Sequence, residues 1–494
     1  MNNVATTVSQ LFQSCYGILP DKITKLPVSG SDRSYFLVTG SDGRQAIATV
    51  GADTAENRAF IYLARHFRSH GIPVPEVYAV SDDEMVYIQE YLGDTSLSDM
   101  LSPDGSYSTE TKKIIERCIR LLPHIQMTGA CRMDFSRCYP EQRLSMRTIS
   151  NDLSYFKYCF LKSVGLDFDE CALDSELESL RDIIYDDAKT SVTFMVRDFQ
   201  SRNIMLKDGN PYVIDFQGGR IGPAQYDLVS FLWQAKAAFP DEIKQHMIEA
   251  YIDEAASISP KFDKDKFRTL LPVYVLFRIL QTLGAYGFRG WTERKPHFLR
   301  SIPNGVKSLF NFFASPMDTE FANAASRFPY LKELSARIAD SQKILDLKAI
   351  AGLPQYNGLT LTVSSFSYKR GVPYDLSGNG GGFVFDCRGI NNPGRYEEYR
   401  SLTGLDAPVR RFLEEDGEII SFLSNATAIV EKSVECYMQR GFSSLCVAFG
   451  CTGGRHRSVY SAETLAHHFA VKYPLVRVVV HHREQNLLTV LTTL

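Results

Sequence analysis

The segment V-R-D-F-Q-S-R-N-I-M-L-K-D-G-N-P-Y-V-I-D-F-Q, residues 196–217, decides how the first part of this chain folds. Asp198 and Asn203 are separated by four residues, and Asp215 follows twelve residues after Asn203, at the end of a β-rich run. Another β-rich run precedes Asp198. We therefore expect two strands that bracket a polar loop and hold these three oxygen-bearing side chains side by side.

This pattern is typical of phosphoryl transfer. The reaction needs a carboxylate that orients the acceptor hydroxyl and takes its proton, and it needs oxygen ligands for Mg²⁺ to neutralise the nucleotide phosphates. The alternative is an ordinary hairpin in which the Asp and Asn side chains satisfy backbone groups of the turn. Three such residues at this spacing favour a phosphotransferase.

Further motifs surround this core, namely S-D-R-S-Y-F at 31–36 and G-P-A-Q-Y-D-L-V-S at 222–230. With them, residues 10–330 resemble the aminoglycoside phosphotransferase family. Within that family the chain is most similar to the anomeric N-acetylmuramate and N-acetylglucosamine kinases of cell-wall recycling. The resemblance implies a two-lobed protein-kinase-like fold and an enzyme that uses ATP and Mg²⁺ to phosphorylate an amino sugar.

The resemblance also assigns individual residues. Asp198 would be the catalytic base, and Asn203 and Asp215 would bind Mg²⁺. Asp227 would brace the catalytic loop rather than touch substrate. The residues expected to contact the nucleotide are Ser31, Asp32, Arg33, Gln89, Glu90 and Tyr91.

One departure from the family bears on activity. The strand that normally carries a phosphate-binding lysine reads A-I-A-T-V at 46–50 and has no lysine. Charge on the phosphates must then be met by Mg²⁺, by backbone amides of the 29–34 turn and by Arg33. Glu56 in the next helix lacks its usual partner, so we expect it at the surface. The alternative is a catalytically silent kinase-fold scaffold joined to a ligand-gated adapter.

A second constellation, S-S-L-C-V-A-F-G-C-T-G-G-R-H-R-S-V at 443–459, reads as strand, loop and helix. The loop opens onto a helix N-terminus, where unsatisfied N–H groups and the helix dipole favour an anion. Gly453 and Gly454 allow close backbone approach, and Ser458 can cap the helix. A plain strand–helix turn explains the glycines but not the three basic residues at 455–457, so the pattern predicts a phosphate-binding loop.

With S-F-S-Y-K-R-G-V-P at 365–373, F-V-F-D-C-R-G-I-N-N-P at 383–393 and L-T-G-L-D-A-P-V at 402–409, residues 358–486 resemble the RapZ C-terminal domain. In that family the domain binds glucosamine 6-phosphate and takes part in RNA binding and oligomerisation. The residues assigned to the sugar phosphate are Thr452, Gly453, Gly454, Arg455, His456, Arg457 and Ser458, with Asp386, Arg388 and Asn392 nearby. The family's P-loop nucleotidase motif, G-x4-G-K-[ST], does not occur in this chain.

Two other roles for this region stay open. The spacing C-x5-R-S at 451–458 is also that of cysteine phosphatases, with Asp386 as a candidate acid, although Gly450 replaces the usual histidine. Basic pairs such as 369–370 and 410–411 could bind RNA, but acidic runs interrupt them. We therefore expect a sugar phosphate as the partner, treat RNA as the less favoured one, and leave an oligomer open.

The composition is that of a globular protein: 494 residues, 44% hydrophobic, 22% charged, with a formal charge of −3. It excludes a disordered or fibrous chain and gives no reason to expect nucleic acid or an anionic membrane. No run reaches about 18 uninterrupted apolar residues, and the start lacks a signal-peptide pattern, so we expect a cytoplasmic protein without a membrane partner. The ten cysteines contain no CxxC pair and are expected to be reduced.

The fold class expected is α+β and α/β, a two-lobed kinase-like fold followed by a smaller α/β domain with a strand–phosphate loop–helix. The expected segments are a kinase domain at 1–330, with its N-lobe at 1–92 and its C-lobe at 93–330, a helical linker at 331–355, and the sugar-phosphate domain at 356–494. Strands are expected at 34–40, 45–50, 85–92, 360–368, 383–388 and 444–450, and helices at 54–70, 406–440 and 457–471.

Overall fold

The structure is a computed structural model that describes residues 2–27, 33–102, 104–234, 237–354, 356–375, 381–415 and 417–491. The chain divides into two compact units, each assembled from separate parts of the sequence. The first unit comprises residues 1–156, 168–282 and 308–334, and the second comprises 157–167, 283–307 and 335–494. The domain limits expected from the sequence follow chain order and stay a prediction.

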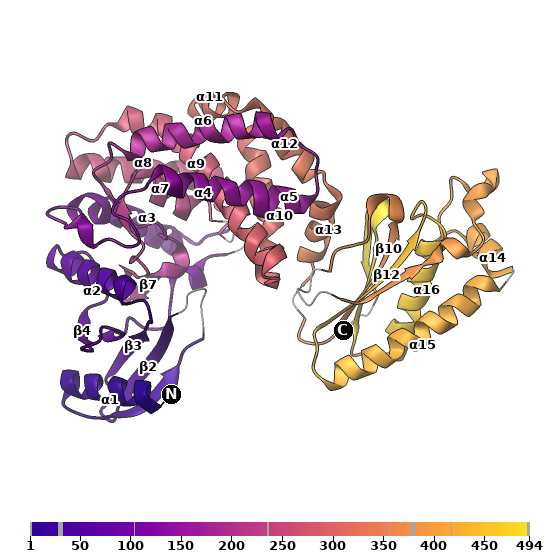
Figure 1. Cartoon of the computed structure of the whole chain (residues 1–494), viewed down its shortest axis with the longest axis horizontal. Coiled ribbons are helices and arrows are strands. Elements are labelled where there is room, and N and C mark those ends of the chain that lie inside the picture. Colours follow the sequence, from indigo (N-terminus) through magenta and orange to yellow (C-terminus); the bar gives the residue numbers. More distant parts are fainter. Residues whose placement is uncertain are drawn as a thin grey trace. The chain divides into compact units, whose positions relative to one another are not determined.

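An antiparallel sheet of five strands opens the first unit (Figure 1). In spatial order its strands are β1 (Pro20–Lys25), β2 (Ser34–Gly40), β3 (Gln45–Val50), β5 (Val86–Glu90) and β4 (Val77–Val80). The predicted hairpin of β2 and β3 is confirmed. Helix α1 (Asn2–Tyr16) packs its Phe12 against Ala46 and Ala48 of β3, all fully buried. The residues of β3 that alternate with Ala46 and Ala48, among them Thr49, therefore face away from α1.

Helix α2 (Thr54–Ser69) follows the sheet, as the sequence predicts. It begins at Asp53, whose carboxylate accepts hydrogen bonds from the N–H groups of Ala55 and Glu56, an N-cap arrangement. Ala59, Leu63 and Phe67 recur at helical spacing and are buried. The cap and the apolar stripe together fix the position of Glu56 in the first turn of the helix.

The rest of the first unit is mainly helical. The helices in or beginning in this part are α3 (Thr109–Pro123), α4 (Met146–Tyr155), α6 (Glu170–Ala188), α7 (Gln225–Leu232), α8 (Asp241–Ile258), α9 (Lys264–Gly287), α11 (Thr319–Ser326) and α12 (Pro329–Ala339). Two small antiparallel pairs lie among them, β6 (Phe194–Met195) with β9 (Arg220–Ile221) and β7 (Ile204–Lys207) with β8 (Asn210–Val213). The quoted segment 196–217 contains the β7–β8 hairpin and the loop that precedes it.

The second unit holds a five-stranded sheet, with four parallel strands and one antiparallel edge strand. Its spatial order is β11 (Phe383–Asp386), β12 (Ser444–Cys451), β10 (Thr360–Ser367), β13 (Arg477–His482) and β14 (Leu487–Val490). The remaining helices are α5 (Lys162–Val164), α10 (Pro296–Ala314), α13 (Gln342–Ala351), α14 (Ala407–Glu415), α15 (Glu418–Gln439) and α16 (Arg457–Lys472). The predicted strands and helices of this region are confirmed, whereas β13 and β14 were not predicted.

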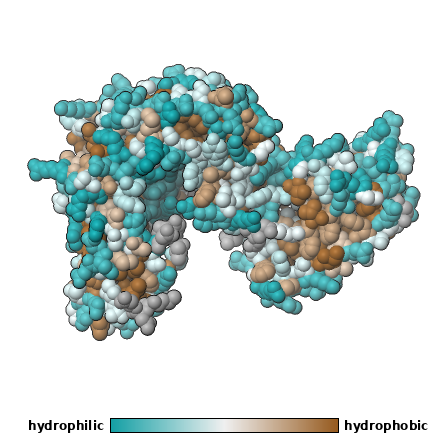
Figure 2. Space-filling view, viewed as in Figure 1, coloured by the Kyte–Doolittle hydropathy of each residue, from teal (hydrophilic) through white to brown (hydrophobic). Residues whose placement is uncertain are grey.

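One face of this sheet carries the apolar core of the second unit. Leu361 and Val363 of β10 and Val447 of β12 are buried there together with Val430 of α15 and Leu465 of α16. Figure 2 shows apolar side chains gathered on the visible face of this unit. Since successive residues of a strand point to opposite faces, the residues of β10 that alternate with Leu361 and Val363 belong to the other face of the sheet.

Within the described residues, one helical stretch, Lys264–Thr292, is long and apolar enough to cross a membrane by length and composition. Its apolar window is 72% buried inside the protein, with a mean hydropathy of 1.3. A buried core helix has the same length and composition, so we assign this stretch to the helical core.

Candidate functional site

The loop between β6 and β7 brings the three predicted oxygen-bearing residues together. Nδ2 of Asn203 donates to the backbone carbonyl of Asp198 at 2.9 Å and lies 3.3 Å from Oδ2 of Asp215. Gln217 donates to the other oxygen, Oδ1 of Asp215, at 2.8 Å. Asp198 and Asp215 are half-buried, and Asn203 is 6% exposed. The sequence spacing therefore translates into one compact polar group.

Two non-glycine residues of this group have positive φ angles, Arg197 at 75° and Asp215 at 62°. Such conformations are uncommon for residues with a side chain and persist where surrounding contacts impose them. Arg197 directly precedes Asp198, so the backbone at both carboxylates is held in a strained shape. This strain is typical of a functional loop.

Asp227, in the first turn of α7, forms hydrogen bonds to the backbone at the start of the loop. It is fully buried, and its carboxylate accepts hydrogen bonds from the N–H groups of Val196 and Arg197, both at 2.8 Å, and from Nε2 of Gln126 at 2.8 Å. Burial raises the pKa of Asp227 to about 7. Asp227 thus fixes the backbone next to Asp198, which is the bracing role expected from the sequence.

The donor set fits a magnesium ion. Mg²⁺ takes oxygen ligands and is commonly held by one or two protein side chains, with substrate phosphates and water completing its octahedron. Asp215 offers a carboxylate, and the side-chain amide of Asn203, which here donates to that carboxylate from Nδ2, also contains an oxygen. No group of three or more His, Cys, Asp or Glu residues suited to a metal occurs in the part of the chain that the structure describes. A site completed by nucleotide phosphates is therefore the arrangement that these residues support.

Arg33 corrects one expectation from the sequence. Its side chain is only 3% exposed, and its Nη2 lies 3.2 Å from Oε1 of Glu56. The guanidinium also lies over the ring of Phe60, 6.0 Å from the centroid. The prediction that Glu56 is a surface residue without a partner was wrong, because an arginine from the start of β2 reaches it in place of the missing strand lysine.

The other residues expected to contact the nucleotide are placed as follows. Gln89 is 9% exposed and donates to Oγ1 of Thr49 in β3 at 3.1 Å. Glu90 forms an ion pair with Nζ of Lys207 at 2.5 Å, which joins the end of β5 to β7. Tyr91 follows the strand and is half-buried. Ser31 and Asp32 lie outside the described residues.

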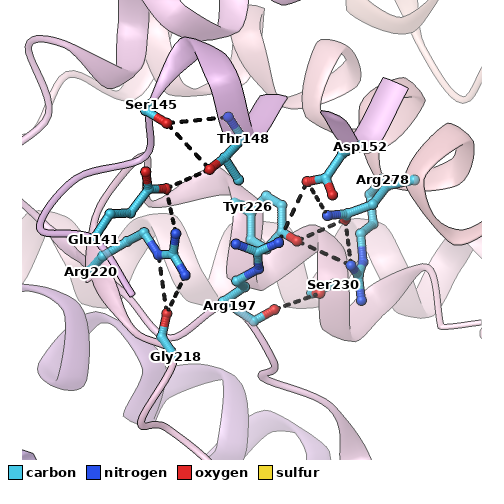
Figure 3. A network of polar contacts seen from close by, with 11 residues as sticks. Glu141, Ser145, Thr148, Asp152, Arg197, Gly218, Arg220, Tyr226, Ser230 and Arg278 are labelled. Atoms are coloured by element: carbon cyan, nitrogen blue, oxygen red, sulfur yellow. Dashed lines mark hydrogen bonds and ion pairs between the residues drawn. The ribbon is translucent and has the colours of Figure 1, made fainter. Parts of the chain in front are cut away.

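A polar network that the sequence did not reveal surrounds Arg197 (Figure 3). Asp152 of α4 lies 3.7 Å from Nη2 of Arg197 and accepts a hydrogen bond from Gln281 at 2.6 Å. Arg278 donates to Gln281 at 2.5 Å and to the hydroxyl of Tyr226 at 3.1 Å. Burial raises the pKa of Asp152. These residues come from helices far apart in the sequence, which is why spacing alone could not find them.

A third guanidinium belongs to the same network. Arg220 is 2% exposed, pairs with Glu141, and donates to the carbonyl of Gly218 at 3.0 and 3.1 Å. Arg278, by contrast, forms no ion pair with a carboxylate among the described residues, although its side chain is half-buried. Arg197 and Arg278 both act on the carboxylate of Asp152, so two guanidinium groups share one carboxylate in this part of the network.

In the second unit, the predicted phosphate loop joins β12 to α16. Thr452 and Gly453 are exposed, and no described residue accepts a hydrogen bond from their backbone N–H groups. Gly454 has a φ of +66°, and a Cβ placed there would lie 2.8 Å from the backbone nitrogen of Ser367. The tight turn thus requires glycine at 454, and it leaves two N–H groups open at the N-terminal end of α16.

The basic side chains of this loop are tied to backbone carbonyls. Arg455 donates to Ser401 at 3.3 Å, and Nε2 of His456 lies 2.9 Å from the carbonyl of Tyr399. Arg457, 4% exposed, donates from Nη1 to the carbonyls of Arg388 and Ile390 at 3.0 and 2.8 Å. Burial lowers the pKa of His456. An anion bound at this loop would therefore contact the backbone N–H groups rather than these basic side chains.

The remaining predicted residues lie around this loop. Arg388 contacts Asp386 through Nε at 3.0 Å and Nη2 at 2.7 Å, which lowers the pKa of Asp386. Asn392 accepts a hydrogen bond from the N–H of Gly394 at 3.2 Å. Ser458 is fully buried and lies 3.1 Å from Sγ of Cys451. The prediction that Ser458 caps α16 was wrong, because the N-cap position is His456 and no side chain caps it.

The contacts of Cys451 and Arg457 argue against the phosphatase alternative. Sγ of Cys451 accepts a hydrogen bond from the N–H of Gly454 at 3.2 Å. The arginine of the C-x5-R spacing, however, is held by the carbonyls of Arg388 and Ile390. A phosphatase loop needs that guanidinium for the oxyanion, so this arrangement favours binding over hydrolysis.

Two family models match the chain. A model described as the phosphotransferase enzyme family matches residues 22–268, which is half of the chain. A model described as the RapZ C-terminal domain matches residues 359–486. The first match covers the loop with Asp198 and Asp215, and the second covers the loop at 452–458.

Curated relatives match the C-terminal part. A nucleotide-binding protein of Thiobacillus denitrificans is 41% identical over 138 residues, 28% of this chain and 46% of that protein. A nucleotide-binding protein of Paraburkholderia phymatum is 42% identical over 130 residues, 26% of this chain and 41% of that protein. The chain therefore spans less than half the length of these relatives.

Solved structures are similar to the first part. Amicoumacin kinase, in complex with AMP-PNP and Ca²⁺, has a TM-score of 0.44 and 13% identity, over 68% of this chain and 95% of its own. An ethanolamine kinase of Plasmodium vivax has a TM-score of 0.43 and 12% identity, over 60% of this chain and 84% of its own.

Proposed function

The chain belongs to the phosphotransferase enzyme family, and on that premise we propose that its first unit transfers the γ-phosphoryl group of ATP to a hydroxyl of an amino sugar. The acceptor we favour is the anomeric hydroxyl of N-acetylmuramate or N-acetylglucosamine. The observation that carries the proposal is the contact of Asn203 with both the Asp198 carbonyl and the Asp215 carboxylate. It keeps Asn203 between the backbone of Asp198 and the carboxylate of Asp215, which supports a base and two metal ligands in one site.

Each residue has a defined task in this reaction. Asp198 orients the acceptor hydroxyl and takes its proton, while the hydroxyl oxygen bonds to the γ-phosphorus and the bond to the β-phosphate oxygen breaks. Asp215 and Asn203 would hold Mg²⁺. When bound, that ion neutralises charge on the phosphates. Arg33, held by Glu56, supplies the positive charge that the strand lysine supplies elsewhere in the family.

The surroundings of Asp198 bear on the acceptor. Arg197 directly precedes it, and Arg197 and Arg278 share the single carboxylate of Asp152. These two guanidinium groups disfavour a polycationic acceptor. They suit a neutral or carboxylate-bearing sugar, since guanidinium groups pair with carboxylates. N-acetylmuramate carries a carboxylate and N-acetylglucosamine is neutral, so both are compatible with these two guanidinium groups.

The test is acceptor-dependent ADP release by the purified chain with Mg·ATP and a panel of amino sugars. Asp198→Asn should abolish release because it removes the base. Asp208→Asn is the matched control, since Asp208 is exposed in the β7–β8 turn and contacts none of the three site residues. If no sugar stimulates release, or if both variants behave alike, the catalytic proposal fails and the silent scaffold is favoured.

For the second unit, the same proposal assigns a sugar-phosphate site to the loop at 452–458, in a cytoplasmic protein. The open N–H groups of Thr452 and Gly453, in the loop that leads into α16, support it. Glucosamine 6-phosphate should raise the unfolding temperature or change kinase turnover, and Thr452→Pro, which removes one of these N–H groups, should reduce either response. This substitution is preferred to Arg457→Ala, which would leave two buried carbonyls without a donor. A wild-type protein that responds to neither test would exclude the site.

A further inference from the structure

A cavity of about 520 Å³ lies within the second unit, on the polar face of its five-stranded sheet. The alternation of β10 creates this face. Leu361 and Val363 join the apolar core shared with α15 and α16. Thr360, Thr362 and Ser364, which alternate with them, line the cavity. Every residue that lines it belongs to the second unit.

Two buried polar side chains face each other across neighbouring strands of this floor. Ser364 of β10 is directly opposite His481 of β13 in the parallel register. Ser364 is 7% exposed and His481 is 4% exposed, and both line the cavity. The charge of Asp346, another lining residue, acts on the His481 ring. The floor therefore offers a hydroxyl and an imidazole to a ligand that forms hydrogen bonds.

Two guanidinium groups stand at the same cavity. Arg300 of α10 is exposed, and Arg477 of β13 donates to Oγ1 of Thr360 at 3.1 Å. Burial and the nearby Arg300 lower the pKa of Arg477. Neither arginine forms an ion pair with a carboxylate among the residues that the structure describes. Two adjacent positive charges without counter-ions favour a doubly charged anion.

The carboxylates of the lining do not neutralise this charge. Oδ2 of Asp346 lies 3.0 Å from Nε of Arg483, so its charge is already paired. Asp375 accepts a hydrogen bond from Sγ of Cys446 at 3.4 Å and another from the N–H of Gly381 at 3.3 Å. Asp375 keeps its negative charge, because both of these donors are neutral, so Arg300 and Arg477 together leave the lining with a net positive charge.

We propose that this cavity binds a phosphorylated sugar ring. The ring hydroxyls would bond to Ser364, Thr362 and His481, and the phosphate would pair with Arg300 and Arg477. Apolar side chains of α10 and α13, Leu299, Leu347 and Ile350, would cover the face of the ring. The volume suits a monosaccharide phosphate or a mononucleotide, which share this chemistry. The site is separate from the loop at 452–458 and does not depend on the kinase being active.

Each of the two sites in this unit contains its own histidine, and this allows a direct test. His481 reports on the cavity and His456 reports on the loop. In the full chain, the ¹³Cε1 resonances of the histidines are followed by NMR during titration with glucosamine 6-phosphate, AMP or inorganic phosphate. The His481→Asn and His456→Asn variants assign the two signals.

We expect glucosamine 6-phosphate or AMP to shift the His481 signal, and the ligand that shifts it identifies the source. Arg300→Gln should weaken this response about tenfold, because one charge-assisted contact is lost. Lys307→Gln removes the same charge from the same helix outside the cavity and should leave the response unchanged.

Three results would overturn the proposal. The first is a His481 signal that no phosphorylated sugar or nucleotide moves while the His456 signal responds. The second is an equal effect of Arg300→Gln and Lys307→Gln. The third is a His481 response to inorganic phosphate equal to that with glucosamine 6-phosphate, which would exclude a role for the hydroxyl-lined floor. Kinase activity, measured by ADP release, enters none of these outcomes.

Discussion

Arg33 and Glu56 form the ion pair that the missing strand lysine would otherwise complete. Protein kinases use a lysine on this strand, paired with a glutamate of the following helix, to hold the nucleotide phosphates. Here Thr49 occupies the face of β3 away from α1 and bonds to Gln89. Arg33 enters from the start of β2 instead, with its side chain buried and 3.2 Å from Glu56. On the proposed function, this guanidinium would take the role of the lysine ammonium group.

This substitution predicts a specific kinetic effect. Arg33→Ala should lower kcat/KM for ATP about 10- to 100-fold, the value of one charge-assisted contact to phosphate. Arg33→Lys should recover part of the loss, since lysine restores the positive charge but not the planar, two-pronged set of N–H donors of a guanidinium group. Arg58→Ala, an exposed arginine of the same helix as Glu56, is the control and should have no effect. Steady-state kinetics with varied ATP measure all three, and an unchanged value for Arg33→Ala would refute the role.

Asp227 predicts a dependence of stability on pH. Its pKa is about 7 in the folded protein and about 3.9 for aspartate in an unfolded chain. As pH rises, the unfolded chain loses this proton first, so the stability contributed by Asp227 is full below pH ~4 and is lost as pH rises through ~7. Asp227→Asn should remove this slope.

Asp227→Asn should also lower the free energy of unfolding by about 1–3 kcal/mol, because the amide cannot accept from both backbone N–H groups at Val196 and Arg197. Denaturant unfolding of both proteins between pH 4 and pH 8 measures the slope and the loss together. Parallel curves for the wild type and the variant would show that Asp227 does not titrate in this range.

At the scale of elements, the loop between β12 and α16 depends on one glycine and not on its neighbour. Gly454 has a positive φ, and a Cβ there would meet the backbone nitrogen of Ser367. A Cβ at Gly453 would meet nothing within 4 Å. The two adjacent glycines therefore have different physical reasons to be present.

We predict that Gly454→Ala lowers the free energy of unfolding by about 1–3 kcal/mol, since it adds both strain and a steric clash. Gly453→Ala should change this free energy by less than ~0.5 kcal/mol. Urea denaturation of the two variants compares them directly. Equal losses in both would mean that the loop does not have the conformation described.

The elements were largely predictable where the signal is local. The β2–β3 hairpin, α2, β10, β12 and α16 follow from alternation, turn residues and helical spacing within one segment. The contact between Asn203 and Asp215 was predictable for the same reason, because the two residues flank one hairpin.

The contacts that sequence reasoning missed join distant segments. The partner of Glu56 comes from another strand, and Arg197, Asp152 and Arg278 meet only after three helices have packed. His481 gave no signal, because its burial depends on residues outside β13 that cover that face of the sheet. Tertiary packing decided these positions, and the local pattern contains no trace of it.

At the scale of the whole molecule, two units carry different candidate sites on one chain. The first contains the residues proposed for phosphoryl transfer, and the second contains the loop at 452–458 and the cavity over β10. Each site is built within its own unit. Ligands of the two units should therefore slow hydrogen exchange in separate segments of the chain.

Hydrogen exchange of the full chain measures both effects. Mg·ATP should slow exchange at residues 196–217, and glucosamine 6-phosphate should slow exchange at 452–458, because each ligand stabilises the segment that binds it. Mg·ADP is the control for the first effect, since it lacks the transferable phosphoryl group but retains two phosphates. Protection at 452–458 by Mg·ATP alone, with none at 196–217, would contradict the assignment of sites to units.

The central claim is that Asp198, Asn203 and Asp215 form a working phosphotransferase site. Mass spectrometry of the product formed from N-acetylmuramate or N-acetylglucosamine with Mg·ATP tests it most directly. We predict a sugar that has gained one phosphoryl group at its anomeric oxygen, formed by the wild type and by Asp208→Asn but not by Asp198→Asn. A phosphorylated sugar made equally by Asp198→Asn, or none made by the wild type from either sugar, would contradict the account.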